Sequence, residues 1–449
     1  MVREIISIGV GQCGVNMMQT HYEAMLREHN LGFDGYSKDK TGLHKHLSSY
    51  TNESNPSVYF SENIDGSISG RALLIDLDSQ SINNARSSSL ARILDPTSFL
   101  SHRYTARNNW CEGQYGIGNE MIDKIIDGVR KHIEEADSCF EFHFAHSLSG
   151  GTGSGLGSKI INQVNEHYFN KIFMTFTVLP TLDSEIVVSP YNAILSMPTL
   201  IEFITLVNFV SNSAVSSMLD IENPVGKHDY SKVNEVVQRS VSAMTASMRF
   251  PGGCNGDLIK LATNLCPFLR QHFISASYAR ASLSGTTKRT PTEITRELIS
   301  SLHDERNSIS GTKSREGKTL TSATIFRGPL LPHLCAHQLH RHTAINSHYQ
   351  ASMTTSHLQL HSTTPDIDDD QISAATLSQS TAVKQSLAAM CDMFDGLYRR
   401  RAFVQSFTSL GMDMHEFDDA YYNTDVLVSE YGHYEGESDR GDDENEDDE

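Results

Sequence analysis

The segment SGGTGSG, residues 149–155, decides how this sequence is interpreted. It follows the alternating apolar run CFEFHFAHSL (139–148) and precedes a segment with helical spacing, GLGSKIINQVNEHY (155–168). Glycine loses more backbone entropy on ordering than any other residue, so a compact chain needs a reason to place several together. Two reasons are open: a flexible linker, or a loop whose backbone comes close to a large anionic group.

The surrounding pattern favours the second reason. A strand, KIFMTFTVLP (171–180), completes a strand–loop–helix–strand unit, and REIISIGV (3–10) and GRALLIDLD (70–78) are predicted as buried strands before it. The amphipathic segment NEMIDKIIDGVRKHIEEAD (119–137) is predicted as a helix. Strands that alternate with helices indicate an α/β fold with a parallel, doubly wound sheet, whose ligands bind at the carboxyl ends of the strands. A glycine loop at that edge presents N–H groups and a helix N-terminus to a phosphate.

The loop matches neither of two common phosphate-binding patterns. A P-loop needs G-x-x-x-x-G-K-[ST], but Gly157 is followed by Ser158 before Lys159, and G-x-G-x-x-G does not occur here.

Composition narrows the class of protein. The chain has 449 residues, of which 38% are hydrophobic, and no run reaches the length of a membrane-spanning helix, so no membrane insertion is expected. Its seven cysteines lack any CxxC pair, which favours reduced thiols over a disulfide framework or a zinc site. The net charge of −19 argues against nucleic acid as a main partner.

Part of that negative charge lies at one end. Residues 435–449 hold ten acids and one Arg, a net charge of −9, and no apolar residue, so they are predicted to be a disordered acidic tail. The tail either attracts basic partners or only keeps the chain soluble. The rest of the sequence is predicted to form a nucleotide-binding domain (1–211), an intermediate α+β domain (212–379) and a C-terminal helical domain (380–434).

Several further elements are expected. GQCG (11–14) is predicted as a turn, and residues 231–250, 380–411 and 416–434 are predicted as helical. Residues 340–380 are rich in Ser, Thr and His and give no prediction.

GGTGSG after a strand, GQCG near the start and the acidic tail together resemble the tubulin superfamily. Further segments are similar to landmarks of that family: SPYNAIL (189–195), SMRFPGG (247–253), FRG (326–328) and RRRAFVQSF (399–407). The resemblance implies the tubulin fold, which has a Rossmann-like, parallel-sheet GTP-binding domain, an α+β middle domain and a C-terminal helical layer. It also implies that the chain binds GTP or GDP, with Mg²⁺.

The resemblance assigns the nucleotide site residue by residue. The assigned residues are Gln12, Cys13 and Asn16 on the diphosphate and sugar side, Asn108 at the terminal phosphate, Ser147, Gly150, Gly151, Thr152 and Gly153 as the phosphate cradle, Asn212 and Asn234 as guanine-reading amides, and Tyr230 as the ring that stacks on the base. Asp76 and Asp78 are expected to hold Mg²⁺ through water, although they also fit a solvated strand end. Without the resemblance, the Asn residues would be read as surface polar groups.

The sequence departs from the family at three of these places. Asn16 replaces the usual Gln, Arg107 in TARNN replaces a Gly, and Ser79 replaces a Pro. The preference between GTP and GDP therefore stays open. In α-type chains a glutamate near the core helix promotes hydrolysis on the neighbouring subunit, but the matching residue here is Lys260. The expectation is at most a slow GTPase that contains no catalytic acid of its own.

The resemblance leaves the type of tubulin open. MVREI at the start favours a γ-type chain, whereas RRRAF and LVSEY favour a β-type chain. The first hypothesis is a divergent γ-tubulin that nucleates microtubules and caps their minus ends at centrosomes or spindle poles, in the cytoplasm. Its expected partners are α/β-tubulin, ring-complex proteins and laterally associated copies of itself. The second is a divergent β-type tubulin that pairs with α-tubulin in the lattice, and the third is a nucleotide-dependent metabolic enzyme.

Overall fold

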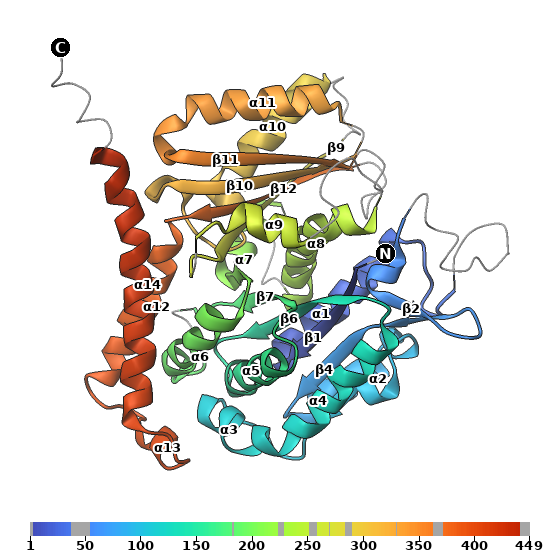
Figure 1. Cartoon of the computed structure of the whole chain (residues 1–449), viewed down its shortest axis with the longest axis vertical. Helices are drawn as coiled ribbons and strands as arrows, with labels where there is room; N and C mark the ends of the chain where they lie inside the picture. Colours follow the sequence, from blue (N-terminus) through green and yellow to red (C-terminus); the bar gives the residue numbers. More distant parts are fainter. Residues whose placement is uncertain are drawn as a thin grey trace.

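The computed structural model describes residues 3–36, 54–181, 184–222, 229–250, 258–268, 270–282, 290–328, 330–361 and 371–440. A ten-stranded sheet, in the order β11-β10-β12-β9-β8-β7-β6-β1-β4-β5, crosses the molecule, and helices pack on both of its faces (Figure 1).

One half of the sheet is parallel, as predicted. Every neighbouring pair from β5 to β9 runs in the same direction. The strands are β1 (Glu4–Val10), β4 (Ala72–Asp76), β5 (Phe99–Ser101), β6 (Cys139–Ser147), β7 (Ile172–Val178), β8 (Leu206–Val210) and β9 (Phe273–Ser282). Alternate residues of β1 enter two different cores, because Ile5 packs on one face and Ile6 and Ile8 on the other. This arrangement confirms the predicted parallel, doubly wound sheet.

The helices divide between these two faces. α1 and α8 contribute to the core that contains Ile5, and α4, α5 and α6 contribute to the other. The bounds are α1 (Gly11–Glu28), α2 (Ser79–Ser87), α3 (Trp110–Gln114), α4 (Ile117–Glu135), α5 (Gly157–His167), α6 (Ser189–Phe203), α7 (Asn212–Glu222) and α8 (Tyr230–Arg249). α8 confirms the helix predicted at 231–250.

The predicted turn at 11–14 is wrong, because these residues form the first turn of α1. Gly11 has φ +73°, which lets one residue reverse the chain between β1 and the helix. A Cβ at Gly14 would lie 2.1 Å from the carbonyl oxygen of Ala145, so α1 packs directly against β6 there.

The other half of the sheet is mixed. β12 (Gln371–Ser380) runs antiparallel to β9 and to β10 (Thr319–Arg327), which in turn pairs in parallel with β11 (Gln350–His361). α10 (Pro291–Leu302) and α11 (Pro332–Ile345) lie outermost beside these strands, and α9 (Leu258–Leu265) precedes β9 (Figure 1). The region from 340 to 380, which gave no prediction, therefore holds β11, β12 and the end of α11. β8 and β9 lie on either side of the expected domain division at 211/212, and hydrogen bonds join them in one sheet. The domain boundaries stay a prediction.

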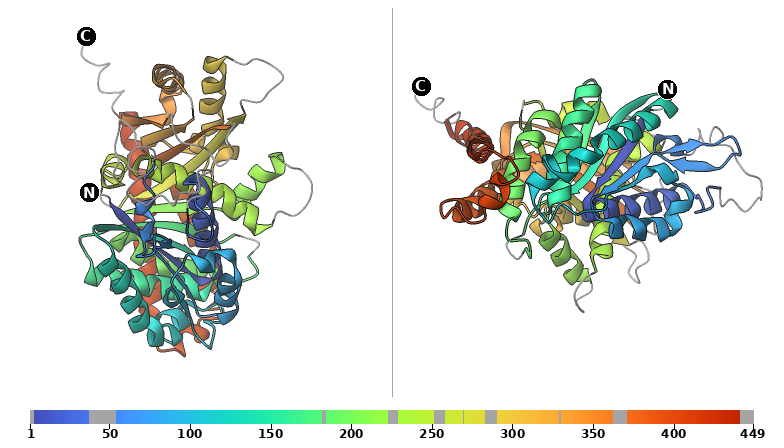
Figure 2. Two further views of the ribbon diagram at one scale, coloured as in Figure 1. Left: turned by 90° about the vertical axis from the view of Figure 1, so that its right-hand side faces the viewer. Right: turned by 90° about the horizontal axis from the view of Figure 1, so that it is seen from below.

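Three C-terminal helices lie along one side of the molecule: α12 (Val383–Tyr398), α13 (Gln405–Thr408) and α14 (Met414–Arg440) (Figures 1 and 2). They dock through aromatic side chains, since the Tyr191 ring on α6 lies 5.4 Å from the Phe394 ring and 5.1 Å from the Phe417 ring. The continuous helix expected over 380–411 is wrong. It breaks after Tyr398, where Arg401 and Phe403 adopt positive φ.

The expected start of the tail at 435 is also wrong. α14 continues to Arg440, and the carboxylate of Glu435 accepts a hydrogen bond of 2.7 Å from the Thr381 hydroxyl and pairs with Lys384. These contacts hold the helix against the start of α12. The rest of the predicted tail, 441–449, lies outside the described residues.

Short elements complete the chain: strands β2 (Phe60–Glu62) and β3 (Ile68–Gly70), and 3₁₀ turns at Pro56–Val58, Ser89–Arg92, Pro96–Ser98, Glu305–Asn307, Ser314–Glu316 and Ser347–Tyr349. In the described ranges, no helix is both long and apolar enough to cross a bilayer.

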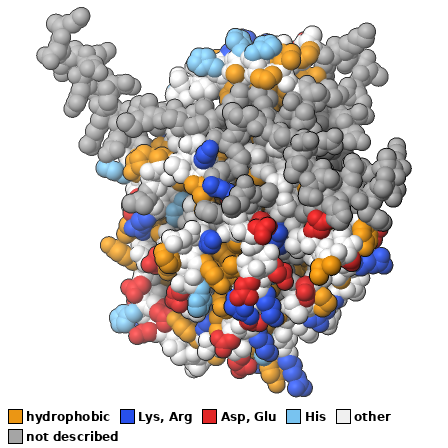
Figure 3. Space-filling model, turned by 45° about the vertical axis from the view of Figure 1, so that its right-hand side comes forward, with side chains coloured by type: hydrophobic (Ala, Val, Ile, Leu, Met, Phe, Trp, Pro, Cys, Tyr) orange, Lys and Arg blue, Asp and Glu red, His pale blue; other side chains and the backbone are white. Residues whose placement is uncertain are grey.

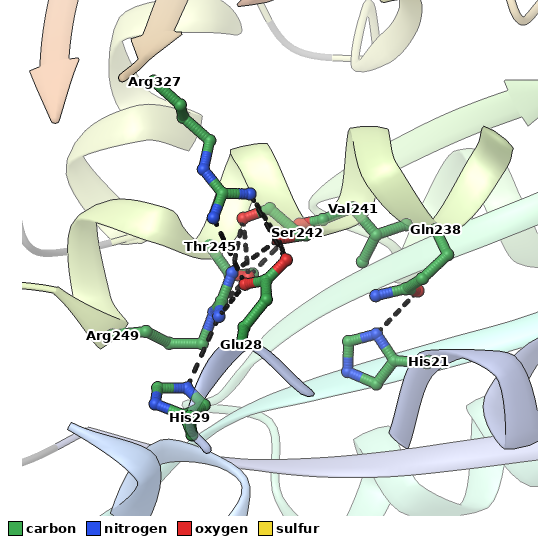
Figure 4. Close-up of polar contacts among 9 residues, drawn as sticks. All are labelled: His21, Glu28, His29, Gln238, Val241, Ser242, Thr245, Arg249 and Arg327. Atoms are coloured by element: carbon green, nitrogen blue, oxygen red, sulfur yellow. Dashed lines mark hydrogen bonds and ion pairs between the residues drawn. The ribbon is translucent and has the colours of Figure 1, made fainter. Parts of the chain in front are cut away.

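A buried ionic cluster joins the two halves of the sheet (Figure 4). Glu28, near the end of α1, binds Arg249 at the end of α8 (2.6 Å) and Arg327 at the end of β10 (3.3 Å). All three side chains are at most 2% exposed. Burial raises the pKa of Glu28, but the two guanidinium groups outweigh burial and hold it below its usual range. A second contact between α1 and α8 is the 2.8 Å hydrogen bond between His21 and Gln238.

Candidate nucleotide-binding site

A pocket of about 390 Å³ lies at the carboxyl ends of β1, β4 and β6. Parallel strands present their C-terminal ends at one edge of the sheet, and ligands bind there in folds of this kind. The pocket contains these sequence-predicted residues: Gln12, Cys13, Asp76, Asp78, Asn108, Ser147, Gly150, Gly151, Thr152 and Gly153.

The glycine loop forms the floor of the pocket. After β6 the chain makes a π-helical turn, Thr152–Leu156, that continues directly into α5. Ser154 closes the turn, because its backbone N–H (3.1 Å) and its hydroxyl (2.6 Å) both donate to the Gly150 carbonyl. Single π-helical turns occur often at functional sites, and the N-terminal end of a helix favours negative charge. The floor therefore suits phosphate groups.

The glycines of this loop have different roles. A Cβ at Gly151 would lie 2.5 Å from both the backbone N and O of Asn109, and a Cβ at Gly153 would lie 2.6 Å from the Ser147 carbonyl. These two glycines allow backbone segments to pack together. A Cβ at Gly150 would meet only the Asn108 side-chain oxygen, at 3.9 Å, so Gly150 borders open space. Among the loop glycines that line the pocket, Gly150 is the one where a ligand has room to approach.

The loop at 105–109 forms a wall of the pocket beside the glycines. Arg107 (φ 48°) and Asn108 (φ 57°) are both left-handed and exposed. Left-handed backbone costs about 1–2 kcal/mol for a residue with a Cβ, so this wall is strained. At Arg107 the resemblance expects glycine, which adopts such angles freely. The Arg side chain replaces that freedom with a positive charge beside the pocket.

Asn192 on α6 holds both loops of the pocket, although it is not among the residues predicted from the sequence. Its side-chain amide donates 2.8 Å hydrogen bonds to the carbonyls of Asn108 and Ser149, and its oxygen accepts one from the Trp110 N–H at 2.9 Å. The residue is fully buried. Asn192 lies in SPYNAIL, a segment that resembles a family landmark, and this resemblance was the signal that could have identified it.

Asp76 is suited to a cation. It is 3% exposed, and its Oδ1 accepts a 3.1 Å hydrogen bond from the Asp78 N–H. Its buried Oδ2 has no hydrogen-bond partner among the residues that the structure describes. Burial raises the pKa of Asp76 to about 6, against the effect of that hydrogen bond and of the nearby Ser81 and Thr152 hydroxyls. A bound cation would supply the missing partner. Asp78 is also engaged, since its carboxylate caps α2 by accepting from the Gln80 N–H at 2.9 Å.

These two carboxylates fit Mg²⁺, which keeps several waters and takes only one or two carboxylates beside phosphate oxygens. In the part of the chain that the structure describes, no group of three or more His, Cys, Asp or Glu is placed to hold a metal ion. Water and nucleotide would therefore complete the coordination.

Four predicted residues do not line this pocket. Asn16 is exposed on α1, and Asn212 begins α7 directly after β8. Tyr230 is 68% exposed at the start of α8, and Asn234, one turn later, lines a small separate cavity with His21 and Gln238. Their contacts with the sugar and base stay a prediction.

Further pocket and supporting residues were not predicted from the sequence, although most of them lie close to the predicted ones. Thr105, Ala106, Ser149 and Ile186 line the pocket. Beneath the loop, the His146 ring contacts the Gly153 carbonyl (3.0 Å) and the Thr177 hydroxyl (3.2 Å). Burial lowers the pKa of His146 to about 4, so the ring is neutral near pH 7 and supports the loop by hydrogen bonding.

Comparison with known proteins agrees with this geometry. A family model described as Tubulin/FtsZ family, GTPase domain, matches residues 4–220. The chain is 33% identical to a tubulin beta chain of Candida albicans over 435 residues, which are 97% of this chain and 95% of the relative. It is 32% identical to a tubulin beta chain of Saccharomyces cerevisiae over 435 residues, with 97% and 93% covered. It is 33% identical to the tubulin beta-6 chain of Gallus gallus over 439 residues, with 97% and 96% covered. With a phosphate-type pocket on a parallel sheet and this similarity over nearly its whole length, the chain belongs to the tubulin family.

Proposed function

We propose that this chain binds guanine nucleotide in the pocket at the ends of β1, β4 and β6 and works as a β-type subunit of the microtubule lattice, paired with an α-type subunit. The observation that carries the proposal is the assembled pocket, in which the glycine loop, the strained 105–109 wall and the partner-free Asp76 oxygen converge. The β chains among its relatives favour this reading over the γ-type one.

In this proposal, different residues of the pocket bind different parts of the nucleotide. The N–H groups of the glycine loop face the phosphates, and Asp76 and Asp78 hold Mg²⁺ through water. Arg107 is placed to pair with the terminal phosphate, as a guanidinium group forms strong, charge-assisted hydrogen bonds with phosphate oxygens. Mg²⁺, when bound, neutralises phosphate charge.

The edge of the sheet opposite the nucleotide pocket is relevant to GTP hydrolysis. α9 borders a second cavity, of about 850 Å³, together with Ile172, Thr205 and His272 at the beginnings of β7, β8 and β9. Since these strands are parallel, α9 lies at the edge away from the nucleotide pocket. Lys260 is exposed on α9, with no ion pair among the described residues. A nearby acid, Asp257, with which Lys260 could pair lies outside the described residues.

Subunits stacked end to end would bring α9 of one over the nucleotide of the next. An ammonium group cannot take a proton from water as a carboxylate can, and a general base must lie within hydrogen-bond reach of that water. This chain is therefore proposed to hydrolyse GTP very slowly by itself, and faster when an α-type subunit brings its glutamate to the pocket.

Purification from cells tests the proposal. The expected product is a one-to-one complex with α-tubulin that releases GTP or GDP on denaturation. Release of an adenine nucleotide, or of none, would contradict the nucleotide assignment. Recovery in a large assembly with spoke-like partner proteins would replace the β-type reading by the γ-type nucleation hypothesis, with its ring-complex partners and its location at microtubule-organising centres. Single-turnover GTP assays with and without α/β-tubulin then test the shared hydrolysis, and rapid turnover by the isolated chain would overturn it.

A further inference from the structure

α11 carries histidines along one solvent-facing side. His333, His337 and His340 are all exposed, whereas Cys335, Gln338 and Leu339 bury the opposite side. In Figure 3, histidine side chains gather at the top of the molecule, the region where α11 lies in Figure 1. This face is separate from the nucleotide pocket, since no residue of α11 lines it.

The spacing of His333 and His337 is that of a chelating pair. Residues four apart on a helix lie about 40° apart around the axis, and their Cβ atoms are about 5–6 Å apart. Two imidazoles at that separation can direct one nitrogen each to a common metal ion, at about 2.0 Å. Neither ring is occupied by a hydrogen bond or ion pair in the described part of the chain. Metal binding by the pair would therefore break no hydrogen bond or ion pair made by the described residues.

We propose that His333 and His337 bind one late first-row divalent metal ion, Cu²⁺, Ni²⁺ or Zn²⁺. Imidazole nitrogen suits these ions, and affinity for a given nitrogen site rises toward Cu²⁺. The described residues hold no group of three or more His, Cys, Asp or Glu arranged around a metal, so the two imidazoles are the protein ligands and water completes the shell. The positive end of the α11 dipole lies near His333 and lowers the affinity by about twofold to fivefold relative to a pair in mid-helix.

The coordination positions of the metal that the two histidines leave open determine what the site can bind. A metal held by two ligands on an exposed helix can still accept a donor group from outside. The site can therefore bridge α11 to a histidine or carboxylate of another molecule, while the chain by itself keeps water there.

The probe for the test is copper(II)–iminodiacetate added to the purified full chain, because this chelator leaves few coordination positions and so selects paired imidazoles. The wild-type chain should bind one equivalent of the probe, with the hyperfine pattern of two nitrogen ligands beyond the chelator in electron paramagnetic resonance. His333→Ala and His337→Ala should each weaken binding at least tenfold and remove that pattern. His348→Ala is the matched control, since His348 is exposed nearby but lies outside α11, and it should bind as the wild type does.

Folding is not at risk in these variants, because the replaced rings are exposed and alanine is a strong helix former. Unchanged circular dichroism verifies this. Binding that survives in the His333→Ala/His337→Ala double variant would overturn the proposal. So would an equal loss in the His348→Ala control, or a loss in His340→Ala that His333→Ala does not show.

Discussion

Asn192 on α6 donates a 2.8 Å hydrogen bond to the carbonyl oxygen of Ser149 in the glycine loop. The same amide group donates to the Asn108 carbonyl, so one buried side chain ties the glycine loop to the 105–109 loop. Asn192 does not line the pocket itself, but it positions two loops that do.

Asn192→Asp should open this pocket. The substitution keeps the side-chain shape but replaces two donors by a carboxylate that faces two carbonyl oxygens, and leaving such buried groups unpaired costs about 1–3 kcal/mol each. We expect at least tenfold weaker retention of guanine nucleotide, measured by equilibrium binding of labelled GDP. Ser196→Ala, which removes a buried hydroxyl bonded to Asn192 on the same helix, is the control and should retain nucleotide. Equal affinity in the two variants would contradict the positioning role.

Gly150→Ala and Gly151→Ala should fail in different ways. At Gly150 the new methyl group enters open space beside Asn108, so the fold should hold its melting temperature while nucleotide affinity falls about tenfold or more. At Gly151 the methyl group would lie 2.5 Å from the Asn109 backbone, so the melting temperature should also fall. Thermal unfolding of nucleotide-free protein and nucleotide binding separate the two effects. If Gly150→Ala binds as well as the wild type, the loop does not receive phosphate at that residue.

Asp76→Asn should stabilise the nucleotide-free protein and weaken its use of Mg²⁺. Burial raises the pKa of Asp76 to about 6 from its ordinary value of 3.8, so the folded state holds a proton that the unfolded state releases. This part of the stability is present below pH 3.8 and is lost as the pH rises through about 6. Near pH 7.5 the neutral amide should therefore raise the free energy of unfolding by about 3 kcal/mol.

The same variant should lose most of the Mg²⁺ dependence of nucleotide binding. Asp78→Asn is the comparison, because its amide oxygen can still cap α2, and it should leave stability nearly unchanged. Urea unfolding at pH 5 and pH 7.5 measures the first effect, and nucleotide titrations with and without Mg²⁺ measure the second. A destabilised Asp76→Asn at pH 7.5 would show that this carboxylate is paired in the empty protein.

Arg107 tests whether charge or backbone strain matters in the 105–109 wall. Arg107→Gly and Arg107→Ala both remove the guanidinium group, so both should bind GTP more weakly relative to GDP. Only glycine relieves the left-handed strain at this position, so Arg107→Gly should be more stable than Arg107→Ala by about 1 kcal/mol. Competition binding and chemical unfolding give the two readouts. Tighter GTP binding by both variants would mean that Arg107 excludes the terminal phosphate.

Glu28→Gln should be among the most damaging single substitutions in the described chain. It leaves Arg249 and Arg327 buried without a counter-charge, and breaking a buried ionic group in this way costs about 3–5 kcal/mol. Arg327→Gln is the matched change, because it leaves a neutral Glu28–Arg249 pair and should cost less. Urea unfolding compares them. A smaller loss of stability for Glu28→Gln than for Arg327→Gln would show that the excess positive charge does not destabilise the cluster.

The sequence by itself determined the parallel half of the sheet and the phosphate edge. Buried strands of seven to nine residues, such as Glu4–Val10 and Cys139–Ser147, are continuous apolar or alternating runs, and the glycine loop follows one of them directly. Such signals are local, because each depends on side-chain periodicity and backbone freedom within a few residues. The resemblance then gave the residues of the phosphate pocket by number.

Only the tertiary structure decided how those residues are held. Asn192 is separated by 84 positions from Asn108 and by 43 from Ser149, and the Glu28–Arg327 contact spans 299 positions. The break after Tyr398 and the docking of Glu435 likewise depend on contacts between distant segments. Hydrogen bonds and ion pairs of this kind leave no periodic trace along the chain, since each partner looks like an ordinary polar residue until the fold brings the two together.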